Sequence, residues 1–216
     1  MTLRRLVLLR HGQTDYNAAG IMQGQLDSVL TADGIAQATA VAPMMAAFAP
    51  DLVISSDLRR AVDTAEFVGN ACGLPVKVDP RLRETHLGEW QGKSVAEVER
   101  AYPGAIDRWR RDPTWAPPGG ESRVAVAARA RAVIDELDAE YAVSGVPGDP
   151  NDPESATALI VAHGGVIAGL VCTLLDLPHR VWPAIGGLGN CKWTVLARRR
   201  DDPAWRLAGH NVGLHN

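Results

Sequence analysis

The sequence predicts an α/β fold, a three-layer α/β/α sandwich with a mostly parallel central sheet. Short apolar runs alternate with longer segments in which apolar residues recur every three or four positions. The first pattern is typical of buried strands, and the second of amphipathic helices. Strands that alternate with helices form parallel sheets with helices on their faces. With 216 residues, 46% of them hydrophobic, the chain is expected to form a single domain over residues 1–216.

The first predicted strand, residues 6–9, runs directly into Arg10-His11-Gly12. Open parallel sheets bind their ligands at the carboxyl ends of strands, and a glycine there lets the backbone approach a ligand closely. An imidazole beside a guanidinium can attack a phosphorus atom whose oxygens the guanidinium holds. A histidine that only caps loop carbonyls is the alternative, and this segment alone does not separate the two.

Residues 15–28 are polar and rich in glycine, which predicts a loop that contains Asn17 and Gln23. Amide side chains in loops contact ligands in some proteins and close turns in more of them. A helix is expected after Thr31 as its N-cap residue, with a kink at Pro43. Its apolar positions are Ile35, Ala38, Ala42 and Met45.

The second predicted strand, residues 52–54, precedes a helix with Arg59 and Arg60 in its first turn. Arginine there adds to the positive end of the helix dipole, which is unfavourable for stability and favourable for anion binding. A solvated pair of charges is the more common reason for two adjacent arginines. The pattern alone leaves these alternatives open.

A third strand is predicted at residues 76–78, followed by a loop over residues 81–92 that contains Glu84. A carboxyl group near an apolar wall can act as a general acid. Arg81 and Arg83 lie close by in the sequence, however, and the residues alone favour an ordinary ion pair between Glu84 and one of them.

The next region is expected to be helical at residues 94–111, with a break at Pro103-Gly104. A loop rich in proline and glycine follows at residues 112–121, and its Trp115 is a candidate to cover a pocket. Ser122 is the expected cap of the clearest amphipathic helix, which ends before a surface insertion at residues 144–155. The apolar face of that helix consists of Ala127, Ala130, Ile134, Leu137 and Tyr141.

The fourth predicted strand, residues 159–162, leads into His163-Gly164-Gly165 and a helix, which repeats the order seen after the first strand. In a parallel sheet the ends of these two strands can lie together and bring His11 beside His163. With Arg60 from an adjacent helix, such a site would match a phosphoryl dianion. Two further strands, residues 193–196 and 205–207, are expected at a sheet edge.

The composition limits the possible functions. A net charge of -3 gives no basic surface for nucleic acid, and the apolar runs are too short for a signal peptide or a membrane span. Three cysteines without C-x-x-C spacing indicate neither a disulfide framework nor a zinc site. We therefore expect a cytoplasmic protein that binds neither nucleic acid nor membranes.

Four separated motifs resemble the histidine phosphatase superfamily, in its phosphoglycerate mutase-like branch. They are Leu9-Arg10-His11-Gly12, Ser56-Asp57-Leu58-Arg59-Arg60-Ala61, Arg83-Glu84 with Gly88, and His163-Gly164-Gly165. The resemblance implies that His11 is the nucleophile and Glu84 the proton donor. It also implies that the phosphoryl oxygens are bound by Arg10, Arg60 and His163, with lesser contacts from Asn17 and Gln23, and that no metal or cofactor is required.

Further segments resemble an actinobacterial subgroup of these phosphatases from Arg5 to about Asn211. They include residues 22–27, 83–88, 114–123 and 182–187. The resemblance fails at residues 144–155 and is weaker after Arg206, where this sequence is shorter and more polar than expected. This resemblance implies a small-molecule phosphate monoester as substrate, a glucosylated 3-phosphoglycerate, and a homodimer. Alternatives are a broad-specificity sugar or phosphoglycerate-type phosphatase, a phosphoglycerate mutase that uses the cations at residues 108–111, and a non-catalytic sensor of phosphate esters.

Two other phosphatase chemistries do not fit the sequence. The D-x-D-x-T pattern of enzymes that form an aspartyl phosphate is absent, and no cysteine is followed six positions later by arginine, as in thiolate phosphatases.

Overall fold

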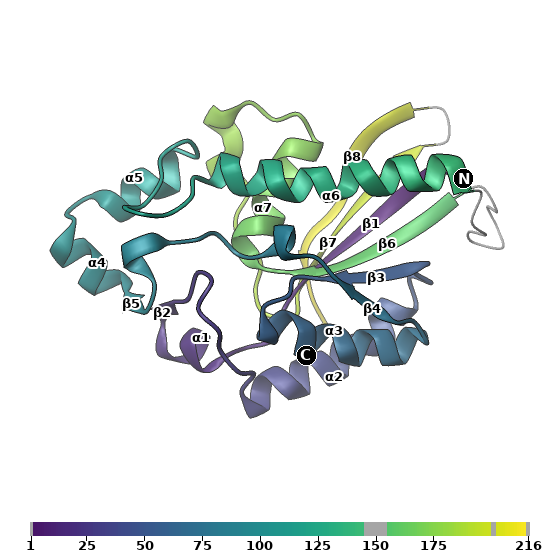
Figure 1. The fold of residues 1–216 in the computed structure, drawn as a ribbon, viewed down its shortest axis with the longest axis horizontal. Coiled ribbons are helices and arrows are strands. Elements are labelled where there is room, and N and C mark those ends of the chain that lie inside the picture. The colour runs from purple at the N-terminus through teal and green to yellow at the C-terminus, as the bar shows by residue number, and fades with distance from the viewer. Residues whose placement is uncertain (1, 145–154, 200–201, 215–216) are drawn as a thin grey trace.

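A computed structural model describes residues 2–144, 155–199 and 202–214. The described residues form a six-stranded sheet with helices against both faces (Figure 1). In sheet order the strands are β4 (Val76–Val78), β3 (Leu52–Ser55), β6 (Ser155–Ala162), β1 (Thr2–Arg10), β7 (Trp193–Arg199) and β8 (Asp202–Val212). The first four run parallel to one another, and β7 and β8 join antiparallel. The predicted sandwich with a mostly parallel sheet is confirmed.

Strand β1 is buried on both of its faces. Leu6 and Leu8 pack in a core with α6 (Arg123–Ser144) and α7 (Gly164–Leu174). Val7 and Leu9 pack in a second core with α2 (Ala32–Ala46) and α3 (Arg59–Cys72). Successive side chains of a strand point to opposite faces, so a strand covered on both sides needs an apolar residue at every position. This requirement explains the uninterrupted apolar run that identified the strand.

The pairing of β1 with β6 brings distant parts of the sequence together. The register places Leu9 opposite Val161 and Arg10 opposite Ala162. The residues that follow, His11 and His163, therefore leave the sheet side by side. On the other side of β6, the Ser56 amide after β3 donates to the Val161 carbonyl at 3.0 Å, which brings the start of α3 to the same edge.

The predicted loop at residues 15–28 is partly wrong, because it contains α1 (Asp15–Ala19) and β2 (Ile21–Met22). A capping box starts the helix: the Thr14 hydroxyl accepts from the Asn17 amide at 3.1 Å, and the Asn17 side chain accepts from the Thr14 amide at 3.2 Å. Gly20, at φ 66°, ends it. Five residues are fewer than two turns, so no helical periodicity marks this element. Strand β2 pairs with β5 (Lys93–Ser94).

The helices after β5 lie where the sequence predicts. The break at Pro103-Gly104 separates α4 (Val95–Ala101) from α5 (Ala105–Arg111), and the Ser122 hydroxyl accepts from the Ala125 amide at 3.1 Å at the start of α6. The predicted apolar face of α6 is buried. Three short 3-10 helices complete the order: η1 (Pro80–Leu82), η2 (Gly88–Trp90) and η3 (His179–Ala184). Residues 145–154, most of the expected insertion, lie outside the described residues.

Strand β8 has 11 residues where three were predicted. It is an edge strand, and its exposed side chains interrupt the apolar alternation that marks a half-buried strand. Trp205 is buried beneath Arg198, whose guanidinium lies 3.9 Å from the ring centroid and also bonds Asp138 of α6. Within the described ranges, no helix is both long and apolar enough to cross a bilayer.

Backbone contact between the start of α2 and the segment after β1 leads to a prediction. A Cβ on Gly34 would lie 2.0 Å from the Gln13 carbonyl oxygen. We expect Gly34→Ala to lower the free energy of unfolding by about 1–3 kcal/mol in urea denaturation, because the backbone must shift to admit the methyl group. At Gly186 a Cβ meets nothing within 4 Å, so Gly186→Ala should change it by less than about 0.5 kcal/mol. Equal effects of the two substitutions would contradict this packing.

Candidate active site

Two buried histidines meet at the carboxyl edge of the sheet. His11 follows β1, and His163 follows β6 as the N-cap residue of α7. Their ring centroids lie 5.1 Å apart with the ring planes inclined by 60°. The sequence predicts this pairing, because it depends only on the two strands being neighbours.

One hydrogen bond determines which ring nitrogen of His11 has a free lone pair. Its Nδ1 lies 2.7 Å from the carbonyl oxygen of Gly12. A carbonyl oxygen only accepts, so Nδ1 carries the hydrogen and Nε2 keeps the lone pair. Burial, and then the charges of Arg10 and Arg60, lower the pKa of His11 well below 6.5. The alternative, a histidine that only caps loop carbonyls, is correct for Nδ1. The other ring nitrogen, Nε2, has a lone pair available for attack.

A hydrogen bond to Ser56 fixes the ring of His163. The ring Nε2 lies 2.9 Å from the Ser56 hydroxyl oxygen, which also accepts from the Leu58 amide at 3.3 Å. When the hydroxyl donates to Nε2, the ring hydrogen is on Nδ1, a buried atom with no hydrogen-bond partner among the described residues. Burial, with the nearby Arg60, lowers the pKa of His163 well below 6.5. In that tautomer, His163 is a neutral ring with a free Nδ1–H donor beside His11.

Arg60 is only 1% exposed, so the solvated alternative is wrong for this residue. Its two terminal nitrogens donate to the carbonyls of Leu26 and Gly24 at 2.9 and 2.7 Å. Burial lowers its pKa to about 10, which leaves the guanidinium charged at neutral pH. Arg59 has a 63% exposed side chain and pairs with Asp63 at 3.5 Å.

Arg10 supplies the second guanidinium of the site. It donates from Nη1 to the Leu188 carbonyl. The Nε atoms of Arg10 and Arg60 are both buried and have no hydrogen-bond partner among the described residues. Buried donors without acceptors are rare in folded proteins and need an explanation. Both residues line one cavity, so two positive charges face the same space.

Glu84 makes no ion pair with Arg81 or Arg83, so that expectation is wrong. Arg81 pairs with Asp79 and Glu136, and Arg83 with Asp57 at 2.7 Å. The Glu84 carboxylate accepts instead from two backbone amides, that of Gly165 at 3.0 Å and that of Thr85 at 2.8 Å. A Cβ at residue 165 would lie 2.5 Å from a Glu84 carboxylate oxygen, so this close approach requires glycine.

Asn17 and Gln23 also line the cavity that contains His11. The Asn17 side-chain oxygen accepts from the Thr14 amide and from the Asn190 side chain at 3.1 Å. The Gln23 side-chain oxygen accepts from the Ser28 hydroxyl at 2.7 Å. Because both oxygens already have partners within the protein, the NH₂ groups remain as donors for the oxygens of a ligand.

Two adjoining cavities share Arg10, Glu84, Trp109 and Gly165 as walls. The smaller cavity, about 190 Å³, also contains His11, Asn17, Gln23 and Arg60. The larger, about 510 Å³, is lined by the cations Arg110, Arg111 and Arg123 and by apolar groups that include Cys172, Trp182 and Ile185. A small anion therefore fits beside the histidines, and a bulkier group attached to it fits the larger cavity.

The tryptophan that lines both cavities is Trp109, whereas the sequence pointed to Trp115. Trp115 packs against Trp90, with ring centroids 5.5 Å apart, and lines neither of these two cavities. The Trp109 indole nitrogen is buried without a partner among the described residues. Its only signal in the sequence is its place between Arg108 and Arg110 in a predicted helix. Among the described residues, no group of three or more His, Cys, Asp or Glu side chains could hold a metal ion.

Comparison with known proteins adds an independent line of evidence. Residues 6–212 match the family model of the histidine phosphatase superfamily (branch 1). The chain is similar to a glucosyl-3-phosphoglycerate phosphatase of Mycobacterium tuberculosis (strain CDC 1551 / Oshkosh), with 53% identity over 197 residues that cover 91% of this chain and 86% of the relative. A protein with the same name from Mycolicibacterium vanbaalenii is 50% identical over 216 residues, which cover 96% and 94% of the two chains.

The fold of the chain is also similar to that of a solved structure. It is that of a mycobacterial glucosyl-3-phosphoglycerate phosphatase in complex with VO₃, which matches with a TM-score of 0.89 and 50% identity. The match covers 97% of this chain and 100% of the other.

The low pKa values of His11 and His163 predict a pH dependence of stability. In the unfolded chain both histidines bind protons as the pH falls through 6.5, while the folded protein keeps them neutral. Stability is therefore lost with falling pH, by up to about 1.4 kcal/mol per pH unit for each histidine. Urea denaturation between about pH 7.5 and about pH 5.5 measures this slope. We expect His11→Gln to reduce it, and an unchanged slope would contradict a neutral His11.

Proposed function

The chain belongs to branch 1 of the histidine phosphatase superfamily and is a phosphoric monoester hydrolase, and we propose that its substrate is glucosyl-3-phosphoglycerate. The products are glucosylglycerate and phosphate. The observation that carries the proposed mechanism is the position of His11, with a lone pair on Nε2, in one cavity with Arg10, Arg60 and Glu84.

In the first step, Nε2 of His11 attacks the phosphorus atom. A P–N bond forms while the P–O bond to the glycerate oxygen breaks. Glu84 in its acid form gives a proton to the departing oxygen, so this poor leaving group never carries a full negative charge. The phosphoryl oxygens are held by Arg10, Arg60 and Nδ1 of His163, with the amide groups of Asn17 and Gln23 as further donors.

In the second step, water hydrolyses the phosphohistidine. Glu84, now a carboxylate, takes a proton from a water molecule whose oxygen attacks the phosphorus. The P–N bond breaks and returns its electron pair to Nε2 of His11. Phosphate is released, Glu84 is again protonated and His11 is again neutral, so the site is ready for another turnover.

The larger cavity suits the rest of the proposed substrate. Beyond its phosphate, glucosyl-3-phosphoglycerate carries one carboxylate and one neutral sugar. Arg110, Arg111 and Arg123 can bind a carboxylate, and Trp109 and Trp182 provide apolar surface for the sugar. The names of relatives at 50% identity or more support the same substrate.

We further propose that the protein acts as a homodimer in the cytoplasm and that the reaction needs no metal ion. The homodimer comes from the family resemblance, and light scattering on the purified protein tests it by measuring the molar mass in solution. That no metal ion is needed follows from the mechanism above, because Arg10 and Arg60 supply the charge that stabilises the phosphoryl oxygens.

The substrate assignment is tested by a comparison of three phosphate esters. We expect kcat/KM to be highest for glucosyl-3-phosphoglycerate, lower for mannosyl-3-phosphoglycerate and lowest for 3-phosphoglycerate, which lacks the sugar, with a chelator present throughout. Similar values for all three would contradict the assignment and favour a broad-specificity phosphatase. The same reaction in ¹⁸O-water should label the released phosphate. Released phosphate without label would count against hydrolysis of a phosphohistidine by water.

Two adjacent arginines provide a test of the phosphoryl site. We expect Arg60→Ala to lower kcat on any phosphate ester by about a hundred- to a thousandfold, because it removes a preorganised donor. Arg59→Ala removes the same side chain from the next position, where it is exposed, and should leave kcat nearly unchanged. Similar losses in the two variants would contradict the assignment of Arg60. Measurable turnover by His11→Ala would equally contradict a phosphohistidine intermediate.

A further inference from the structure

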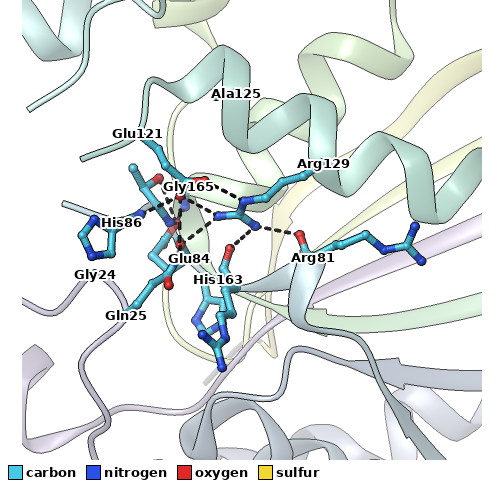
Figure 2. A network of polar contacts seen from close by, with 12 residues as sticks. Gly24, Gln25, Arg81, Glu84, His86, Glu121, Ala125, Arg129, His163 and Gly165 are labelled. Atoms are coloured by element: carbon cyan, nitrogen blue, oxygen red, sulfur yellow. Dashed lines mark hydrogen bonds and ion pairs between the residues drawn. The ribbon is translucent and has the colours of Figure 1, made fainter. Parts of the chain in front are cut away.

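Glu84 lies on a segment with no regular secondary structure. Residues 83–87 connect η1 to η2 and have no strand partner. The backbone carbonyls of such a segment need hydrogen-bond donors from elsewhere, since buried polar groups are almost always hydrogen-bonded. Figure 2 shows where these contacts come from: the guanidinium of Arg129, on α6, lies against the carbonyls of this segment.

All five N–H groups of Arg129 are used. Nη1 donates to the carbonyls of Arg81 and Arg83, each at 2.6 Å, and Nη2 to the carbonyl of Glu84 at 3.0 Å. The two remaining hydrogens, one on Nε and one on Nη2, bind the Glu121 carboxylate in a bidentate pair at 3.0 Å. A planar fork with five donors in fixed directions is specific to arginine.

Glu121 extends the same network to the other side of Glu84. Its carboxylate accepts from the His86 amide at 2.8 Å, and its own amide donates to the His86 carbonyl at 2.8 Å. The side chain of Gln25 adds a second donor to the Glu84 carbonyl, at 3.0 Å (Figure 2). The backbone of Glu84 is thus fixed by Arg129 and Gln25, and its carboxylate by the amides of Thr85 and Gly165.

We propose that Arg129 and Glu121 form a positioning pair that holds Glu84 at the distance from the leaving oxygen that proton transfer requires. The proposal rests on the function proposed above, in which Glu84 is the proton donor. Arg129 lines neither of the two cavities of the site, so it acts through Glu84 and not on the substrate. A displacement of about 1 Å in a reacting group can lower a rate about a hundredfold.

Esters with different leaving groups separate this role from a general structural one. An alkyl phosphate such as glucosyl-3-phosphoglycerate needs the proton from Glu84, whereas p-nitrophenyl phosphate releases a stable phenolate without it. We expect Arg129→Lys, which keeps the charge but not the fork, to lower kcat/KM for the alkyl ester about 10- to 100-fold. For the aryl ester kcat/KM should stay within about threefold, since this constant reports only steps up to P–O cleavage.

A matched control lies on the same helix. Arg131 also binds a carboxylate, that of Asp135, and a backbone carbonyl, that of Thr173. Arg131→Lys should therefore leave the ratio of the two kcat/KM values unchanged. If Arg129→Lys does not fold, Glu121→Gln breaks the bidentate pair with a side chain of nearly the same shape and should give the same selective loss.

Glu84→Gln separates failure of this inference from failure of the proposed function. A selective loss on the alkyl ester in Glu84→Gln, together with equal losses on both esters in Arg129→Lys and Glu121→Gln, would overturn the positioning role alone. If Glu84→Gln loses activity equally on both esters, Glu84 is not the proton donor. The mechanism given under the proposed function is then wrong, and the positioning role that rests on it fails with it. Selective loss in all three variants supports the positioning pair.

Discussion

The chemistry of this site depends on the burial of two guanidiniums and two imidazoles in one place. Burial makes every additional positive charge costly, and the imidazoles lose their protons long before the guanidiniums do. The low pKa values of His11 and His163 are therefore a consequence of the same packing that buries Arg10 and Arg60. Charge for binding an anion and a lone pair for attacking it are both present at neutral pH.

That packing depends in turn on strands that are covered on both faces. The carbonyl of Ala162 accepts from the His11 amide at 3.1 Å, and the Gly12 amide donates to Thr64 of α3 at 3.1 Å. The segment after β1 is therefore bound to the neighbouring strand and to the neighbouring helix. A side chain attached to the buried centre of a sheet is more precisely placed than one on a free loop.

The sequence predicts the parts of the site that follow from local order. Apolar runs that end in histidine and glycine identify the ends of β1 and β6, and neighbouring parallel strands bring those ends together. The ion-pair expectation for Glu84 fails because the partners of Arg81 and Arg83 include Asp57 and Glu136, which are distant in sequence. The role of Trp109 and the network around Arg129 depend on contacts between separate elements. No periodicity records such contacts, so they require the three-dimensional structure.

The two cavities of the site are lined largely by different segments of the chain, so substitutions in one set of segments can leave the other cavity unchanged. The walls found only in the smaller cavity come from residues 11–24, 60 and 85–87, and those found only in the larger one from residues 110–123 and 164–188. Substitutions in the second set can alter the shape of the larger cavity without changing the residues that we propose bind the phosphoryl oxygens. A lineage can thus acquire a new substrate by drift in one set of segments while the other set preserves the reaction. The proposed reaction and the choice of substrate thus depend on largely separate segments of the chain.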